Sequence, residues 1–168
     1  LIKQVSDQVQ DAQKRAGDMK KEFDSIRDRL NRTGVTHAMA ALLKKKRGEL
    51  AQLSRSLRAQ GSKREEIAAA QLARDELEEE RAGMGNVKAT VQQILARAEP
   101  PRSQWERENL SAAITEQVES RLKYLDQLTA DTDKYFNALV DLETAQVQLQ
   151  DLTRSLAHVV DERILWLQ

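Results

Sequence analysis

Apolar side chains along the first thirty residues recur at alternating steps of three and four. This is the heptad pattern of a helix that buries one narrow seam against a neighbouring helix. The pattern predicts a helix over residues 1–31, and the segment 31–34 carries Asn and Gly, which commonly end a helix. The seam is formed by Ile2, Val5, Val9, Ala12, Ala16, Met19, Phe23, Ile26 and Leu30.

Three further helices are predicted between residues 36 and 98. The first spans about 36–60 and ends at Gly61, after which Ser62 and Glu65 have the spacing of a capping box that opens a helix over 63–82. Glycines at 83 and 85 interrupt that helix, and Asn86 is placed to cap a short helix over 87–98.

The last predicted helix, residues 104–167, is the longest. Pro100 and Pro101 stop the helix before it, because proline lacks a backbone N–H and restricts its predecessor. Ser103 and Glu106 form a second capping box, and no Gly or Pro follows up to the C-terminus. A continuous helix here is roughly 95 Å long at about 1.5 Å per residue. Asp131-Thr132-Asp133 is its weakest stretch, but the pattern favours one helix.

The composition supports long helices over a compact globule. Charged residues make up 32% of the chain and aromatic residues 4%, with two prolines and six glycines. Such a composition is typical of long amphipathic helices, and β-branched residues never gather into alternating runs that predict strands. We therefore predict an all-α fold, an elongated antiparallel helical bundle or coiled coil that forms a single domain over residues 1–168.

Charge is distributed unevenly along a chain whose net charge is zero. Residues 1–63 hold 15 basic and 7 acidic residues, whereas residues 64–168 hold 12 and 20. A hairpin turning at 61–62 places the basic run Lys44, Lys45, Lys46 and Arg47 beside the acidic residues Glu76, Glu78, Glu79 and Glu80. We predict interhelical ion pairs between these runs, with contact to anionic lipid or a partner as the alternative. A nucleic-acid ligand is not expected, because the chain lacks a net basic charge.

Candidate catalytic and metal-ligating residues are sparse. The chain has no cysteine, and His37 and His158 lie far apart with no metal-binding motif around them. Neighbouring carboxylates such as Glu78, Glu79 and Glu80 point about 100° apart around a helix, so they do not share one site. We expect no enzyme activity, no metal and no cofactor. The longest apolar run has six residues, far fewer than the roughly 20 that cross a bilayer.

The last residues resemble a segment of a known family. Val160-Asp161-Glu162-Arg163-Ile164-Leu165-Trp166-Leu167 is similar to the segment that precedes the membrane domain in large bacterial mechanosensitive channels of the MscK type. Residues 34–50, 71–81 and 121–133 resemble helical stretches of the same family, and residues 97–105 depart from its pattern. Because the sequence begins with Leu rather than Met, we expect it to be part of a longer chain.

The resemblance implies the N-terminal periplasmic region of a bacterial inner-membrane channel, next to the membrane without spanning it. Its partners would be the rest of the channel chain and further copies, a heptamer in that family, and its role a non-catalytic scaffold that modulates tension-gated efflux. Asp161, Glu162, Arg163, Ile164, Leu165 and Trp166 would form the junction with the membrane domain rather than part of this region's core. A soluble coiled-coil adaptor, cytoskeletal or BAR-like, is the alternative.

Overall fold

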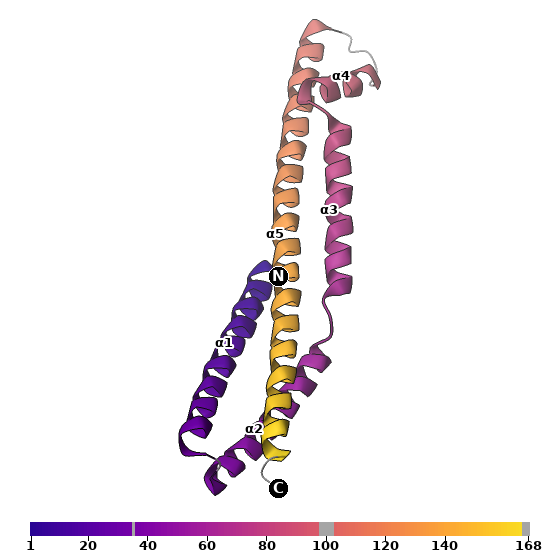
Figure 1. Ribbon diagram of the computed structural model, residues 1–168. Helices are drawn as coiled ribbons and strands as arrows, with labels where there is room; N and C mark the ends of the chain where they lie inside the picture. The colour runs from indigo at the N-terminus through magenta and orange to yellow at the C-terminus, as the bar shows by residue number, and fades with distance from the viewer. Residues whose placement is uncertain (35, 98–102, 166–168) are drawn as a thin grey trace. The chain divides into compact units, whose positions relative to one another are not determined.

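The computed structural model describes residues 1–34, 36–97 and 103–165, and these residues form five helices without a strand. The helices are α1 (Ile2–Thr33), α2 (His37–Gln60), α3 (Arg64–Met84), α4 (Val87–Arg97) and α5 (Gln104–Leu165) (Figure 1). The predicted all-α helical bundle is confirmed. The predicted ends at 98 and 167 lie outside the described residues.

Local signals explain most helix ends. Gly34 and Gly61 follow α1 and α2 with φ angles of 65° and 69°, a backbone region that glycine enters without steric cost. The Asn86 side chain accepts a hydrogen bond from the N–H of Ala89 at 2.8 Å, which is the cap predicted for α4. The N–H of Glu106 donates to Ser103 Oγ at 3.2 Å, so Ser103 caps α5 as expected.

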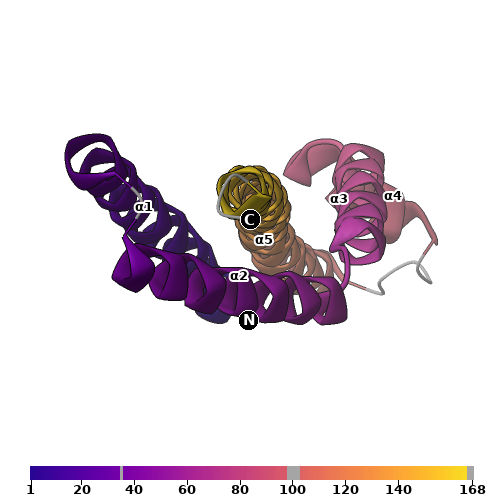
Figure 2. The same cartoon turned by 60° about the horizontal axis from the view of Figure 1, so that its bottom comes forward.

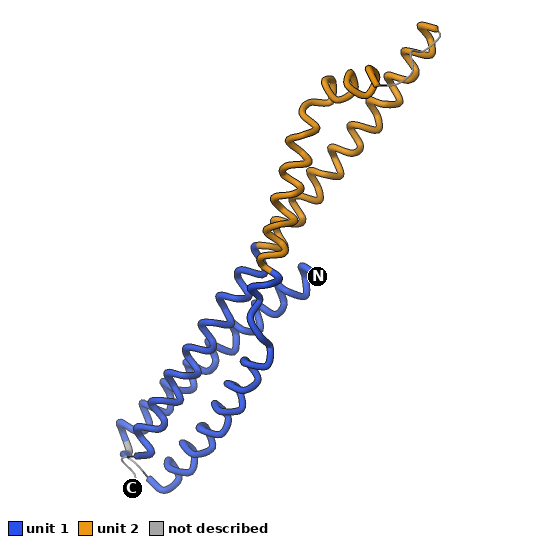
Figure 3. The backbone as a smooth tube through the Cα atoms, turned by 90° about the vertical axis from the view of Figure 1, so that its right-hand side faces the viewer, with its two compact units in different colours: residues 1–66, 137–168 blue, residues 67–136 orange. Residues whose placement is uncertain are grey.

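The chain divides into two compact units where the sequence pattern predicted one domain (Figure 3). Unit 1 contains residues 1–66 and 137–168, and unit 2 contains residues 67–136. Helix α5 contributes to both units and continues through Asp131–Asp133 without a break. The boundary in α5 lies within continuous helical periodicity, whereas the boundary after residue 66 follows the helix break that Gly61 predicted.

Unit 1 is built from α1, α2 and the C-terminal part of α5. The views in Figures 1 and 2 place α1 and α2 on different sides of this part of α5. Helix α2 is antiparallel to both neighbours, whereas α1 runs parallel to α5. The main cluster of buried residues joins all three helices, and it consists of Phe23, Ile26, Met39, Leu43, Leu50 and Val160.

Unit 2 has fewer buried residues than unit 1 among the described residues. Helix α3 buries only Ala70, and α4 buries Val91 against Val118 and Leu122 of α5. Partly buried residues around that small cluster include Met84 and Ile114. The short α4 therefore covers one region of α5, and α3 lies along another.

Candidate functional site

The basic run of α2 is partnered within unit 1. Lys46 Nζ lies 2.6 Å from Glu22 of α1 and 2.5 Å from Glu49 of its own helix, and its side chain is only 14% exposed. The hydrogen bond with Glu22 raises the pKa of Lys46, with a second contribution from Glu49. The hydrogen bond with Lys46 in turn lowers the pKa of Glu49. This arrangement joins α1 to α2.

Arg47 joins α2 to α5. Its Nε lies 2.8 Å from Asp161 Oδ1, and the two side chains are 60% and 45% exposed. Lys45 lies 3.9 Å from Glu49, and no ion pair is recorded for Lys44 among the described residues. Three of the four predicted basic residues therefore have partners, and all of these partners belong to unit 1.

The acidic run of α3 is partnered within unit 2. Arg74 lies 3.1 Å from Glu78 and 2.9 Å from Asp133 of α5. Glu80 pairs with Arg121 of α5 at 2.6 Å. A further pair, Arg81 with Asp126 of α5 at 2.7 Å, lies one heptad beyond Arg74 and Asp133.

The predicted pairing of Lys45, Lys46 and Arg47 with Glu78 and Glu80 is therefore wrong. A hairpin would make α2 and α3 each other's partner, but each helix instead lies antiparallel to α5. The ion pairs show this direction, because residue numbers in α5 fall as those of its partners rise. Arg47 of α2 meets Asp161, and Arg74 of α3 meets the earlier Asp133. The long α5 offers an apolar seam to both helices, and heptad seams do not specify which neighbour they face.

A carboxylate from α5 holds the segment between α2 and α3. Glu143 accepts hydrogen bonds from Ser62 Oγ at 2.9 Å and from the backbone N–H of Lys63 at 2.8 Å. Ser62 Oγ also accepts from the N–H of Arg64 at 3.2 Å. The sequence suggested Ser62 as a cap supported by Glu65, but the carboxylate comes from a residue that is about 80 positions away. No sequence pattern identified Glu143.

The predicted junction residues form the last turns of α5. Asp161 pairs with Arg47, and Glu162 lies 3.2 Å from His158. Ile164 packs against the buried cluster of unit 1, so its assignment to a junction outside the core is wrong. The reason is that Val160 follows Ala157 by three residues and Ile164 follows Val160 by four, so Ile164 continues the apolar seam. Leu165 is 69% exposed, Arg163 is exposed, and Trp166 lies outside the described residues.

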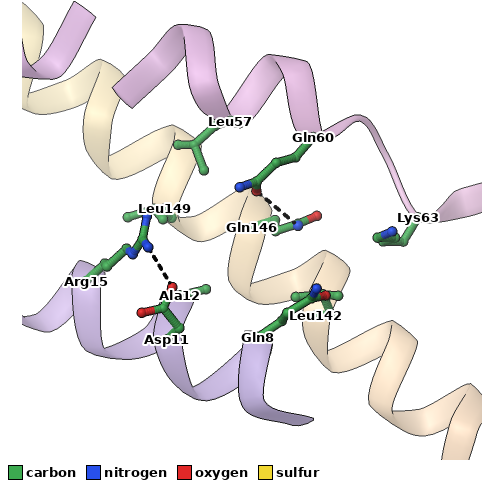
Figure 4. Close-up of a pocket in the computed structure, with 10 residues that line it drawn as sticks. All are labelled: Gln8, Asp11, Ala12, Arg15, Leu57, Gln60, Lys63, Leu142, Gln146 and Leu149. Atoms are coloured by element: carbon green, nitrogen blue, oxygen red, sulfur yellow. Dashed lines mark hydrogen bonds and ion pairs between the residues drawn. The ribbon is translucent and has the colours of Figure 1, made fainter. Parts of the chain in front are cut away.

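A small polar cavity lies between α1, α2 and α5 of unit 1 (Figure 4). Its volume is about 200 Å³, and it contains the Asp11–Arg15 pair at 2.9 Å and a contact of 3.5 Å between Gln60 and Gln146. The lining residues are Gln8, Asp11, Ala12, Arg15, Leu57, Gln60, Lys63, Leu142, Gln146 and Leu149. None of these lining residues is a serine, cysteine or histidine.

Metal-ligating clusters and membrane-spanning helices are both absent from the described part of the chain. No group of three or more metal-ligating side chains converges there. No described helix combines the length and apolar character needed to cross a membrane. Comparison of the sequence with family models, with curated proteins and with solved structures finds no match.

Proposed function

We propose that the chain is a non-catalytic scaffold region of a bacterial mechanosensitive channel of the MscK type, on the periplasmic side of the inner membrane. It would support or modulate tension-gated release of solutes in an assembly of several copies. The observation that carries this proposal concerns the end of α5. The segment that resembles the family's pre-membrane segment is held by two other helices rather than left as a free end.

Three contacts hold this end. Val160 is 1% exposed within the main cluster of unit 1, and Ile164 packs against the same cluster one turn later. Asp161, between them, pairs with Arg47 of α2. A displacement of the last turn of α5 would therefore act on α2 as well. Such coupling is what a scaffold next to a membrane domain needs in order to influence gating.

The location is tested first, with single cysteines in the parent chain. Residues 1–168 contain no cysteine, so Ser155→Cys, at an exposed position of α5, introduces one reactive thiol here. A membrane-impermeant maleimide should label it in cells whose outer membrane alone has been permeabilised. Ala145→Cys, at a position that is 4% exposed, is the matched control and should react only after unfolding. Labelling of Ser155→Cys only after the inner membrane is broken would favour the soluble coiled-coil adaptor.

The scaffold role is tested through the Arg47–Asp161 pair. Arg47→Glu should shift the tension at which the channel opens, because it replaces the attraction between Arg47 and Asp161 by repulsion between two carboxylates at the end of α5. The exchanged pair, Arg47→Glu with Asp161→Arg, should restore the threshold. Arg27→Glu, which alters an exposed pair within α1, is the control. An unchanged threshold in patch recordings of Arg47→Glu would contradict a role in gating.

A further inference from the structure

A groove in unit 1 is lined by several arginines and by small residues. It lies between α2 and α5, has a volume of about 240 Å³, and Ala51, Ser54 and Ala157 are among its lining residues. Arg58 and Arg154 also line it. No ion pair is recorded for Arg58 among the described residues, and Arg154 has only a solvent-exposed partner, Asp151, at 3.7 Å. The groove therefore offers positive charge that the chain itself leaves largely uncompensated.

The outer face of α3 has the complementary character. Leu72 is 60% exposed although it is a large apolar residue. Asp75, Glu76 and Glu79 follow it at steps of three, four and seven, so they share its face of the helix. All three are exposed, and no ion pair is recorded for them in the described part of the chain. This face is thus one apolar side chain bordered by three free carboxylates.

The charges of the two units match this arrangement. Residues 67–136, which are unit 2, contain 9 basic and 13 acidic residues, whereas the rest of the chain contains 18 and 14. The net charges are therefore −4 for unit 2 and +4 for unit 1. Opposite patches of this kind attract each other when two copies of a chain meet, and they fix the register of the contact.

We propose that the α2–α5 groove of one copy binds the outer face of α3 of a second copy. Leu72 lies over the small residues of the groove, and Asp75, Glu76 and Glu79 lie beside Arg58 and Arg154. Because the two surfaces differ, the contact either repeats head to tail, in a ring or an open filament, or is made twice across the two-fold axis of a dimer. This contact does not depend on the channel proposal.

Sedimentation equilibrium of the 168-residue chain tests this contact. The wild-type chain should self-associate, and the affinity should fall as salt is raised because exposed charges contribute. Arg58→Glu with Arg154→Glu should weaken association at least about tenfold, since like charges then face each other. Glu76→Lys with Glu79→Lys should do the same. An equimolar mixture of these two double variants should recover association, because the reversed groove of one fits the reversed face of the other.

Two further variants test the apolar part of the contact and the effect of surface charge outside the groove. Leu72→Ala should weaken association without changing any charge. Because Leu72 is exposed, the variant should stay folded, and circular dichroism checks this directly. Lys14→Glu with Lys20→Glu reverses two exposed charges of unit 1 outside the groove, and this control should associate as the wild type does. A wild-type chain that stays monomeric up to about millimolar concentration overturns the proposal. So does a groove variant that associates normally, or a mixture that does not recover.

Discussion

Helix α5 passes through two environments that differ in how much of it is covered. In unit 1 it packs against both α1 and α2, and all of the largest fully buried side chains of the described residues lie there, namely Leu43, Leu139, Leu142, Leu149 and Val160. In unit 2 it packs against α3 and the short α4, and the most buried residue recorded there is Val118, at 4% exposure. The same helix is thus a core element in one unit and a half-covered one in the other.

The sequence of α5 explains this difference. Asp161 and Asp133 are four heptads apart, and each accepts an arginine from its antiparallel neighbour, so they mark equivalent places. Twelve residues before each aspartate, unit 1 has Leu149 and unit 2 has Arg121. One residue before each, unit 1 has Val160 and unit 2 has Thr132. The positions that face α1 in unit 1 are therefore more polar in unit 2, where a third long helix is absent from the described residues.

Truncating the two equivalent residues should produce the largest difference between the units. Leu149→Ala removes a side chain that is 1% exposed and should cost about 2–5 kcal/mol of unfolding free energy, because a cavity remains. Arg121→Ala removes a side chain that is 64% exposed and should cost about 1 kcal/mol or less. Urea unfolding followed by circular dichroism measures both. Equal costs would mean that the two positions are not equivalent in the way the ion pairs indicate.

Hydrogen exchange should separate the units without any mutation. Helix α2 buries Met39, Leu43, Leu50 and Leu57, whereas α3 buries only Ala70. Segments with few buried contacts open locally at lower free energy cost. Amides of α3 should therefore exchange at least about tenfold faster than those of α2, as mass spectrometry of peptides from 43–57 and 70–84 would record. Equal protection in the two peptides would indicate that unit 2 is held by contacts other than those described.

Helix positions were predictable because their signals are local. The observed ends of α1, α2 and α3 lie within two residues of the predicted ends, since Gly34, Gly61 and Gly85 act at the place where they occur. Helix α3 extends past Gly83 to Met84, because, of the two glycines at 83 and 85, only Gly85 adopts a positive φ, of 58°. The seam of α1 was also correct in outline, with Val5, Ala12, Phe23 and Ile26 buried.

The choice of partners was not predictable in the same way. Any two heptad seams can pack together, so the sequence did not indicate that α3 would pair with α5 rather than α2. Exposed ion pairs add too little energy to decide the pairing. One usable signal was that α5 has an apolar residue, Leu149, at a place in unit 1 where the equivalent place in unit 2 has Arg121. This difference indicates that α5 is covered on two sides only in unit 1. It becomes readable only once Asp161 and Asp133 are known to be equivalent.

The smallest effect concerns the charge that fastens α1 to α2. The raised pKa of Lys46 means that the folded chain holds this proton more tightly than the unfolded chain does. Its contribution to stability is therefore fully present below the ordinary pKa of 10.5 and is lost as pH rises through the higher folded value. Glu49, whose pKa is lowered, contributes to stability above its ordinary pKa of 4.5 and loses that contribution as pH falls.

Lys46→Met should cost about 1–2 kcal/mol of unfolding free energy at pH 7, as expected for hydrogen bonds that involve charged groups. Lys45→Met, at a side chain that is 73% exposed, should cost less than about 0.5 kcal/mol and serves as the matched control. The difference in unfolding free energy between the wild type and Lys46→Met, measured from pH 7 to pH 11, should begin to narrow as the pH rises above 10.5. A difference that stays constant over this range would show that Lys46 stabilises unit 1 through the packing of its aliphatic chain and not through its charge.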